Sequence, residues 1–86
     1  MAKRLGFVGI IIEDRKKGAH EVNDVLSKNG DIIAARMGLP YAEKSCFVIT
    51  LIVDATTDEL GAFTGCLGKI KGVTVRSALS KEKKGR

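Results

Sequence analysis

The stretch CFVITLIVD, residues Cys46–Asp54, decides the fold of this 86-residue chain. Apart from Thr50 and the closing Asp54 it is apolar, and its β-branched and aromatic residues favour a strand that is buried on nearly both faces. A similar stretch, FVGIIIED, occupies Phe7–Asp14 and aligns with FVITLIVD at residues 47–54. Two related hydrophobic strands, each followed by a helix-like segment, predict a chain of two half-domains.

The remaining segments complete this pattern on either side of the two strands. We expect strands at Leu5–Glu13, Asp31–Leu39, Cys46–Asp54 and Val73–Leu79, a charged turn at Asp14–Gly18, and helices at Ala19–Asn29 and Ala55–Ile70. Gly30 is expected to be a left-handed stop and Gly72 to end the second helix, while Thr56 and Glu59 have the spacing of a capping box. Two right-handed split βαβ units predict an α+β, ferredoxin-like βαββαβ sandwich. Its antiparallel sheet has four strands, with the first and third in the middle and both helices on one face.

The central strands carry apolar residues on both faces. In the first strand, Val8 and Ile12 alternate with Phe7 and Ile11. The helices can cover only one of these faces, and a large exposed apolar face is unusual for a soluble monomer. We therefore expect a homo-oligomer, a dimer or tetramer, that forms through the sheet.

Composition narrows the class of protein. One domain is expected at 1–80, followed by a basic tail at 81–86, within a chain of net charge +5. The tail could contact phosphate or an acidic partner, or simply be solvated. Direct nucleic-acid binding is not expected, because the third strand lacks the aromatic residues of an RNA-recognition sheet. No apolar run is long enough to cross a membrane, and two cysteines without paired spacing favour free thiols in a reducing cytoplasm.

Catalytic and metal-binding patterns are not found in the sequence. His20, the single histidine, is interpreted as a surface residue of a helix, and Cys46 and Cys66 as buried, inert thiols without zinc-site spacing. The glycines of GAFTGCLG fall within a helix and form no phosphate loop. We therefore expect no catalytic residue, no metal and no cofactor.

Candidate ligand-binding residues follow the two central strands. The acidic pairs Glu13–Asp14 and Asp58–Glu59 are expected at the same end of the sheet, close to a helix start, with capping as the alternative role. Arg36 and Arg76 are expected on one sheet face, where an arginine can hold a carboxylate bidentately or form an ion pair between subunits. The full set of candidates is Asp14, Arg15, Arg36, Thr57, Asp58, Gly61 and Arg76.

Gly61, Gly65 and Gly68 lie inside the second predicted helix, and each costs about 1 kcal/mol of helix stability relative to alanine. Three such residues in one helix indicate that another backbone approaches closely, or that the helix stays adaptable.

Several motifs resemble a known family. They are GFVGIIIEDR (Gly6–Arg15), NGDIIAARMG (Asn29–Gly38), RMGLPY (Arg36–Tyr41), the run from Ile49 through TTDELGAFTGCLGKIKGV to Val73, and VRSAL (Val75–Leu79). Together they are similar to the iron-only hydrogenase system regulators. The resemblance implies an ACT-like form of the ferredoxin-like fold, related in shape to the ligand-sensing domain of nickel-responsive regulators. Such domains associate through their sheets and bind small effectors at the interfaces. Nickel sensing itself is not expected, because the square-planar site of those sensors needs several histidines.

The leading hypothesis is a non-catalytic regulatory or sensor module linked to the iron-only hydrogenase system. It would act by binding a small-molecule effector at subunit interfaces, or by docking on a hydrogenase-related protein partner. Two alternatives stay open: a small enzyme built on the ferredoxin-like fold, and a nucleic-acid-binding protein that uses the basic tail.

Overall fold

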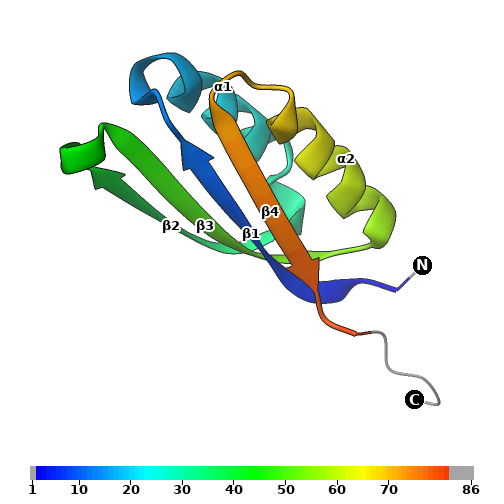
Figure 1. Cartoon of the computed structure of the whole chain (residues 1–86). Coiled ribbons are helices and arrows are strands. Elements are labelled where there is room, and N and C mark those ends of the chain that lie inside the picture. The colour runs from blue at the N-terminus through cyan, green and yellow to red at the C-terminus, as the bar shows by residue number, and fades with distance from the viewer. Residues whose placement is uncertain (1, 82–86) are drawn as a thin grey trace.

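Four antiparallel strands form one sheet in the order β2-β3-β1-β4, and two helices lie along one side of it (Figure 1). The computed structural model describes residues 2–81, so the predicted tail, apart from Lys81, lies outside the described residues. The elements are β1 (Arg4–Ile12), α1 (Arg15–Lys28), β2 (Ile33–Tyr41), β3 (Cys46–Ala55), α2 (Thr57–Gly68) and β4 (Val73–Leu79), with short 3₁₀ turns at Gly30–Ile32 and Ala42–Lys44. The predicted βαββαβ order and the central places of the first and third strands are confirmed.

The core forms where the alternating residues of β1 and β3 meet the helices. In the β1–β3 register Val8 lies opposite Leu51 and Ile10 opposite Ile49, and all four side chains are fully buried. The helices close this layer with Val22, Leu26, Leu60, Phe63 and Leu67. The period of two in the strands therefore separates a helix-covered face from an open face of the sheet.

The first helix begins earlier than its apolar stripe predicts. Asp14 caps it, with a carboxylate oxygen that accepts a hydrogen bond from the Lys16 backbone N–H at 3.1 Å, so the segment predicted as a charged turn is the first turn of α1. Gly18 lies inside this turn and is buried against Ile12, where an added Cβ would come too close to the isoleucine side chain.

The connection after α1 also differs from the prediction. Gly30 has no left-handed backbone; the helix is capped at Asn29, whose side-chain amide donates to the Val25 carbonyl, and a 3₁₀ turn follows. The strand begins at Ile33 because this turn takes up Asp31 and Ile32. In α2, Thr56 and Glu59 form the predicted capping box, but the helix ends at Gly68 and not at Gly72, which has a φ of 79° in the turn before β4.

A β-bulge in β2 changes which residues share a face. Ile33 pairs with Val53 on the helix-covered side, whereas Ala35 pairs with Ile52 on the open side, because the register shifts between them. A strand without the bulge would place Ile33 and Ala35 on the same face. None of the helices in residues 2–81 is long and apolar enough to span a membrane.

Candidate functional site

The open face of the sheet collects the exposed hydrophobic residues. Seven large ones are exposed within residues 2–81, and the strand registers place all of them on this face: Leu5, Phe7, Ile11, Met37, Leu39, Tyr41 and Ile52. Phe7 is 56% exposed and lies opposite Ile52, which is 49% exposed. The predicted bare apolar face is therefore present, and no element within residues 2–81 covers it.

A polar row crosses the middle of the open face. Met37 lies opposite Thr50, Thr50 opposite Gly9, and Gly9 opposite Arg76. Because Gly9 has no side chain and an added Cβ there would meet nothing closer than 4.0 Å, the row contains a gap between Thr50 and Arg76. The row on one side of it is apolar, and the row on the other side is apolar except for Thr74, so Arg76 is a cation at the edge of a hydrophobic surface.

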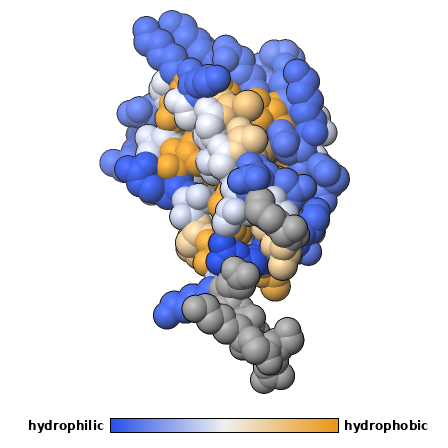
Figure 2. Space-filling model, turned by 90° about the vertical axis from the view of Figure 1, so that its right-hand side faces the viewer, coloured by the Kyte–Doolittle hydropathy of each residue, from blue (hydrophilic) through white to orange (hydrophobic). Residues whose placement is uncertain are grey.

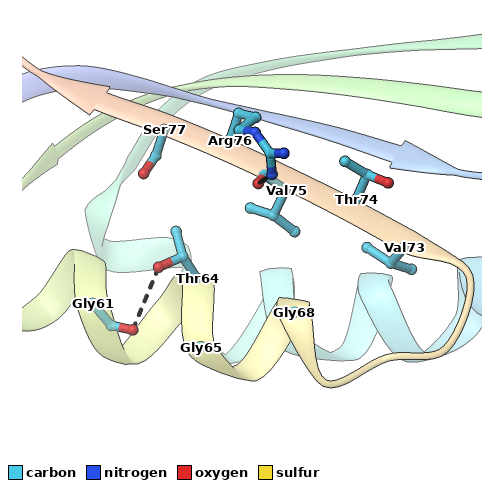
Figure 3. Close-up of a pocket in the computed structure, with 9 residues that line it drawn as sticks. All are labelled: Gly61, Thr64, Gly65, Gly68, Val73, Thr74, Val75, Arg76 and Ser77. Carbon is cyan, nitrogen blue, oxygen red and sulfur yellow. Dashed lines mark hydrogen bonds between the residues drawn. The ribbon is translucent and has the colours of Figure 1, made fainter.

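A second hollow, of about 690 Å³, lies between α2 and β4 (Figure 3). Its lining residues are Gly61, Thr64, Gly65, Gly68 and Val73–Ser77. Figure 3 shows Val73, Val75 and Ser77 directed toward α2, whereas Arg76 lies on the opposite side of the strand. Figure 2 shows neutral and hydrophobic residues in a band down the middle of the side of the molecule that it presents, between hydrophilic flanks.

The glycines of α2 make this groove open. An added Cβ at Gly61, Gly65 or Gly68 would meet nothing within 4 Å. The close backbone approach that their spacing predicts is therefore not made within residues 2–81 of the chain itself. The Thr64 hydroxyl donates to the Leu60 carbonyl at 2.9 Å, so this polar group is bonded within α2 itself.

The two acidic pairs lie at opposite ends of the sheet. In the antiparallel β1–β3 register, Ile12 lies opposite Phe47 and Leu5 opposite Asp54, so the end of β1 is far from the end of β3. The prediction that both pairs share one end is wrong. It treated the two strands as parallel, although their pairing in this fold is antiparallel.

The predicted site residues therefore separate into groups. Asp14 and Arg15 lie at the start of α1, where Asp14 is the cap and also lines a hollow with Lys16; the side chain of Arg15 lies outside the description. Thr57 and Asp58 lie in the first turn of α2, at the opposite end of the sheet.

The two arginines do not share a face. Arg36 lies opposite Leu51 on the helix-covered side and donates to the Asn23 side chain of α1 at 3.1 Å. Arg76 lies opposite Gly9 on the open side. The bulge in β2 explains the error. Of the predicted set, Gly61 and Arg76 both border the α2–β4 groove, although the side chain of Arg76 leaves the strand on the open side.

Other polar residues have structural roles. His20 is exposed on α1, as predicted, and its Nε2 lies 3.7 Å from Oδ2 of Asp24. Cys66 is exposed on α2 and Cys46 is partly buried, which corrects the expectation of two buried thiols. Within residues 2–81, no three His, Cys, Asp or Glu side chains gather into a group that could hold a metal ion.

Sequence reasoning missed Thr50 and the outward edge of β4. The alternating pattern of VTVRSAL and the three glycines of α2 are the sequence features that relate to the outward edge of β4. A strand pattern alone, however, does not show which of its residues lie beside a helix.

Residues 4–77 match the profile of the TM1266-like family, described as "Iron-only hydrogenase system regulator, putative". The chain belongs to this family. The structure of the uncharacterized protein TM1266 from Thermotoga maritima is similar, with 35% identity, a TM-score of 0.88, and coverage of 92% of this chain and 99% of that one. No curated protein matches the chain.

The fold of this TM1266-like chain is ACT-like. The ACT domain from GTP pyrophosphokinase of Chlorobium tepidum superposes with a TM-score of 0.73 and 26% identity, over 88% of this chain and 99% of that domain. The C-terminal domain of the MgtC protein from Mycobacterium tuberculosis shares the fold at a TM-score of 0.71 and 13% identity, over 99% of this chain and 96% of that one. The sequence-based fold and family are confirmed, and ACT domains are regulatory, ligand-binding modules.

Proposed function

We propose that the chain is a non-catalytic regulatory module of the iron-only hydrogenase system, which self-associates through the open face of its sheet and binds a small effector where two copies meet. The observation that carries this proposal is that the seven large hydrophobic residues exposed in the described part of the chain all lie on this one face. A second copy is a suitable cover, because the same apolar face on both subunits is self-complementary around a two-fold axis.

The polar row within the open face supports the effector part of the proposal. Thr50 and Arg76 flank Gly9 in this row, where a small anionic group has room between them; the guanidinium, which donates to the Val75 carbonyl at the outer edge of β4, would turn inward to meet it. Arginine pairs with carboxylate and phosphate groups through parallel hydrogen bonds, which strengthen as water is removed. The effector we propose is therefore a small metabolite with a carboxylate or phosphate group and an apolar part.

Thermal shift against a panel of amino acids, other carboxylates and nucleotides tests the effector. A ligand at one hundred times its Kd adds about 2.7 kcal/mol of stability, which is a clear rise in Tm. We expect Arg76→Gln to abolish the shift and Arg36→Gln to retain it, because Arg36 lies on the helix-covered face. A shift that survives Arg76→Gln would contradict the site.

Solution mass tests the assembly. Phe7→Glu places a carboxylate in the open face and should reduce the oligomer mass, whereas His20→Glu, on the exposed surface of α1, should leave the mass unchanged. A wild-type chain that stays monomeric at high concentration and responds to no metabolite would reject the proposal and point to a protein partner instead.

A further inference from the structure

The outer edge of β4 carries hydrogen-bonding groups that pair with no other strand. Among the strands of residues 2–81, β4 pairs only with β1. Two backbone hydrogen bonds bracket this pairing: Glu13 N–H donates to the Gly72 carbonyl at 2.9 Å, and Ser80 N–H donates to the Leu5 carbonyl at 2.7 Å. Because antiparallel bonding alternates along a strand, the even-numbered residues between them bond to β1. The N–H and C=O groups of Val73, Val75 and Ser77 therefore point away from the sheet.

The position of Arg76 agrees with this assignment. Its guanidinium bends back and donates to the carbonyl of Val75 at 2.8 Å. A carbonyl that was already bonded to β1 would face the other way. One outward acceptor is thus held by an exposed, flexible side chain, which the backbone of an added strand can replace.

The two edges of the sheet are protected to different degrees. At the other edge, β2 contains the bulge between Ile33 and Ala35 and also Pro40, which lacks a backbone donor. Bulges and prolines are features that discourage strand addition. β4 has neither: its seven residues, VTVRSAL, pair with β1 in an unbroken register.

The helix beside β4 leaves room for another strand. Gly61, Gly65 and Gly68 present no side chains to the groove, and an added Cβ at any of them would meet nothing within 4 Å. The glycines weaken α2 without any contact inside the described part of the chain to compensate. The three glycines of α2 therefore leave space next to the unpaired edge of β4.

We propose that a second copy of this chain pairs with β4 edge to edge, antiparallel, about a two-fold axis at Val75. Val73 then lies opposite Ser77 of the second copy, and Val75 opposite its own counterpart. All outward groups of these three residues find partners, in about six backbone hydrogen bonds. The two sheets become one continuous sheet, and the glycine faces of the two α2 helices come side by side.

Repulsion between like charges favours this register over the one whose axis lies one residue later. An axis at Val75 places Arg76 opposite Thr74 of the second copy. An axis one residue later would place Arg76 opposite Arg76, and like charges directly across an antiparallel pair are destabilising. This contact uses the strand edge and leaves the open face free, so it goes beyond the proposed function and does not rest on it.

Disulfide trapping tests the register. In a Cys46→Ser and Cys66→Ser background, Val75→Cys should form a covalent dimer under mild oxidation, because directly opposed residues of a hydrogen-bonded pair have Cα atoms about 5.5 Å apart. Ser77→Cys is the matched control, because two such cysteines would be offset by about 13 Å along the strands. Trapping of Val75→Cys but not of Ser77→Cys supports the proposal. Equal trapping of the two variants overturns it. The absence of trapping in Val75→Cys also overturns it, and this is the result expected if another protein occupies the edge.

Solution mass separates this contact from the one through the open face. Ser77→Pro removes an outward N–H but no bond to β1, so circular dichroism should stay native while the edge contact is lost; Ser77→Ala keeps both. We expect Phe7→Glu and Ser77→Pro each to halve the mass of the assembly, and the double variant to be monomeric. If Phe7→Glu alone gives a monomer, the edge proposal fails and the proposed function stands. If only Ser77→Pro changes the mass, the edge proposal stands and the open-face assembly fails.

Discussion

Glycine has a different physical role at each of the two helix exits. Gly72 follows α2 with a φ of 79°, a conformation that residues with a Cβ avoid. Gly30 follows α1 in a 3₁₀ turn with an ordinary backbone, and an added Cβ there would meet nothing within 4 Å. The two residues look equivalent in the sequence, but only one of them needs to be glycine.

Alanine substitution should separate these two glycines. We expect Gly72→Ala to lower the free energy of unfolding by about 1–2 kcal/mol, because the left-handed conformation is strained in alanine. Gly30→Ala should raise it by about 0.4–1 kcal/mol, because alanine has less freedom to lose on folding. Urea denaturation of both variants measures the difference. A loss of stability in Gly30→Ala would mean that the turn needs glycine after all.

The start of α2 is held by a reciprocal pair of hydrogen bonds. The Thr56 hydroxyl accepts from the Glu59 N–H at 3.1 Å, and the Glu59 carboxylate accepts from the Thr56 N–H at 2.9 Å. This backbone bond is the main reason that the pKa of Glu59 is lowered; nearby Lys3, at 3.7 Å, lowers it further, while partial desolvation opposes the shift. Local sequence thus sets where the helix begins.

Loss of the cap should destabilise the fold measurably. We expect Thr56→Ala to lower the free energy of unfolding by about 1 kcal/mol, because the N–H of Glu59 loses its acceptor. Thr57→Ala is the control: Thr57 is exposed at the first position of the helix and should change stability by no more than about 0.5 kcal/mol. Equal losses in the two variants would show that the cap contributes nothing specific.

The same cap predicts a pH dependence. The folded-state pKa of Glu59 is below its unfolded value, so its contribution is fully present above the ordinary glutamate pKa and is lost as pH falls through the lowered folded value. The stability advantage of the wild type over Glu59→Gln should therefore be constant near neutrality and shrink in acid. Denaturant unfolding across this range measures it. If the stability difference between the wild type and Glu59→Gln does not change with pH, the ionised carboxylate of Glu59 does not stabilise the cap.

The molecule as a whole is a small domain with one covered and one uncovered sheet face. An 86-residue chain buries only about 60–65% of its extended surface, so its core alone supplies little excess stability. The hydrophobic residues of the open face expose apolar surface that becomes buried only when the chain associates. Stability and assembly should therefore be linked.

That linkage predicts a Tm that depends on protein concentration. We expect the Tm of the wild type to rise over a hundredfold increase in concentration, because mass action favours the associated, folded state. The Tm of the double variant Phe7→Glu, Ser77→Pro should not respond. Calorimetry at several concentrations makes the comparison. A wild-type Tm that is independent of concentration would separate folding from association and contradict both proposed contacts.

Local patterns predicted much of this structure because their causes are local. The alternation in FVGIIIED and CFVITLIVD defines two strands and their apolar faces, and the spacing of Thr56 and Glu59 defines a capping box. From these follow the βαββαβ order, the central strands and the bare face, all of which the structure contains.

Only the tertiary structure decided which distant residues meet. The antiparallel register of β1 and β3 places Asp14 and Asp58 at opposite ends of the sheet, and the bulge in β2 turns Arg36 away from the face that holds Arg76. It also shows that the α2 glycines border an open strand edge. Strand direction, a one-residue register shift and the placement of a helix over a sheet depend on contacts between segments far apart in the chain, and no short stretch of sequence contains them.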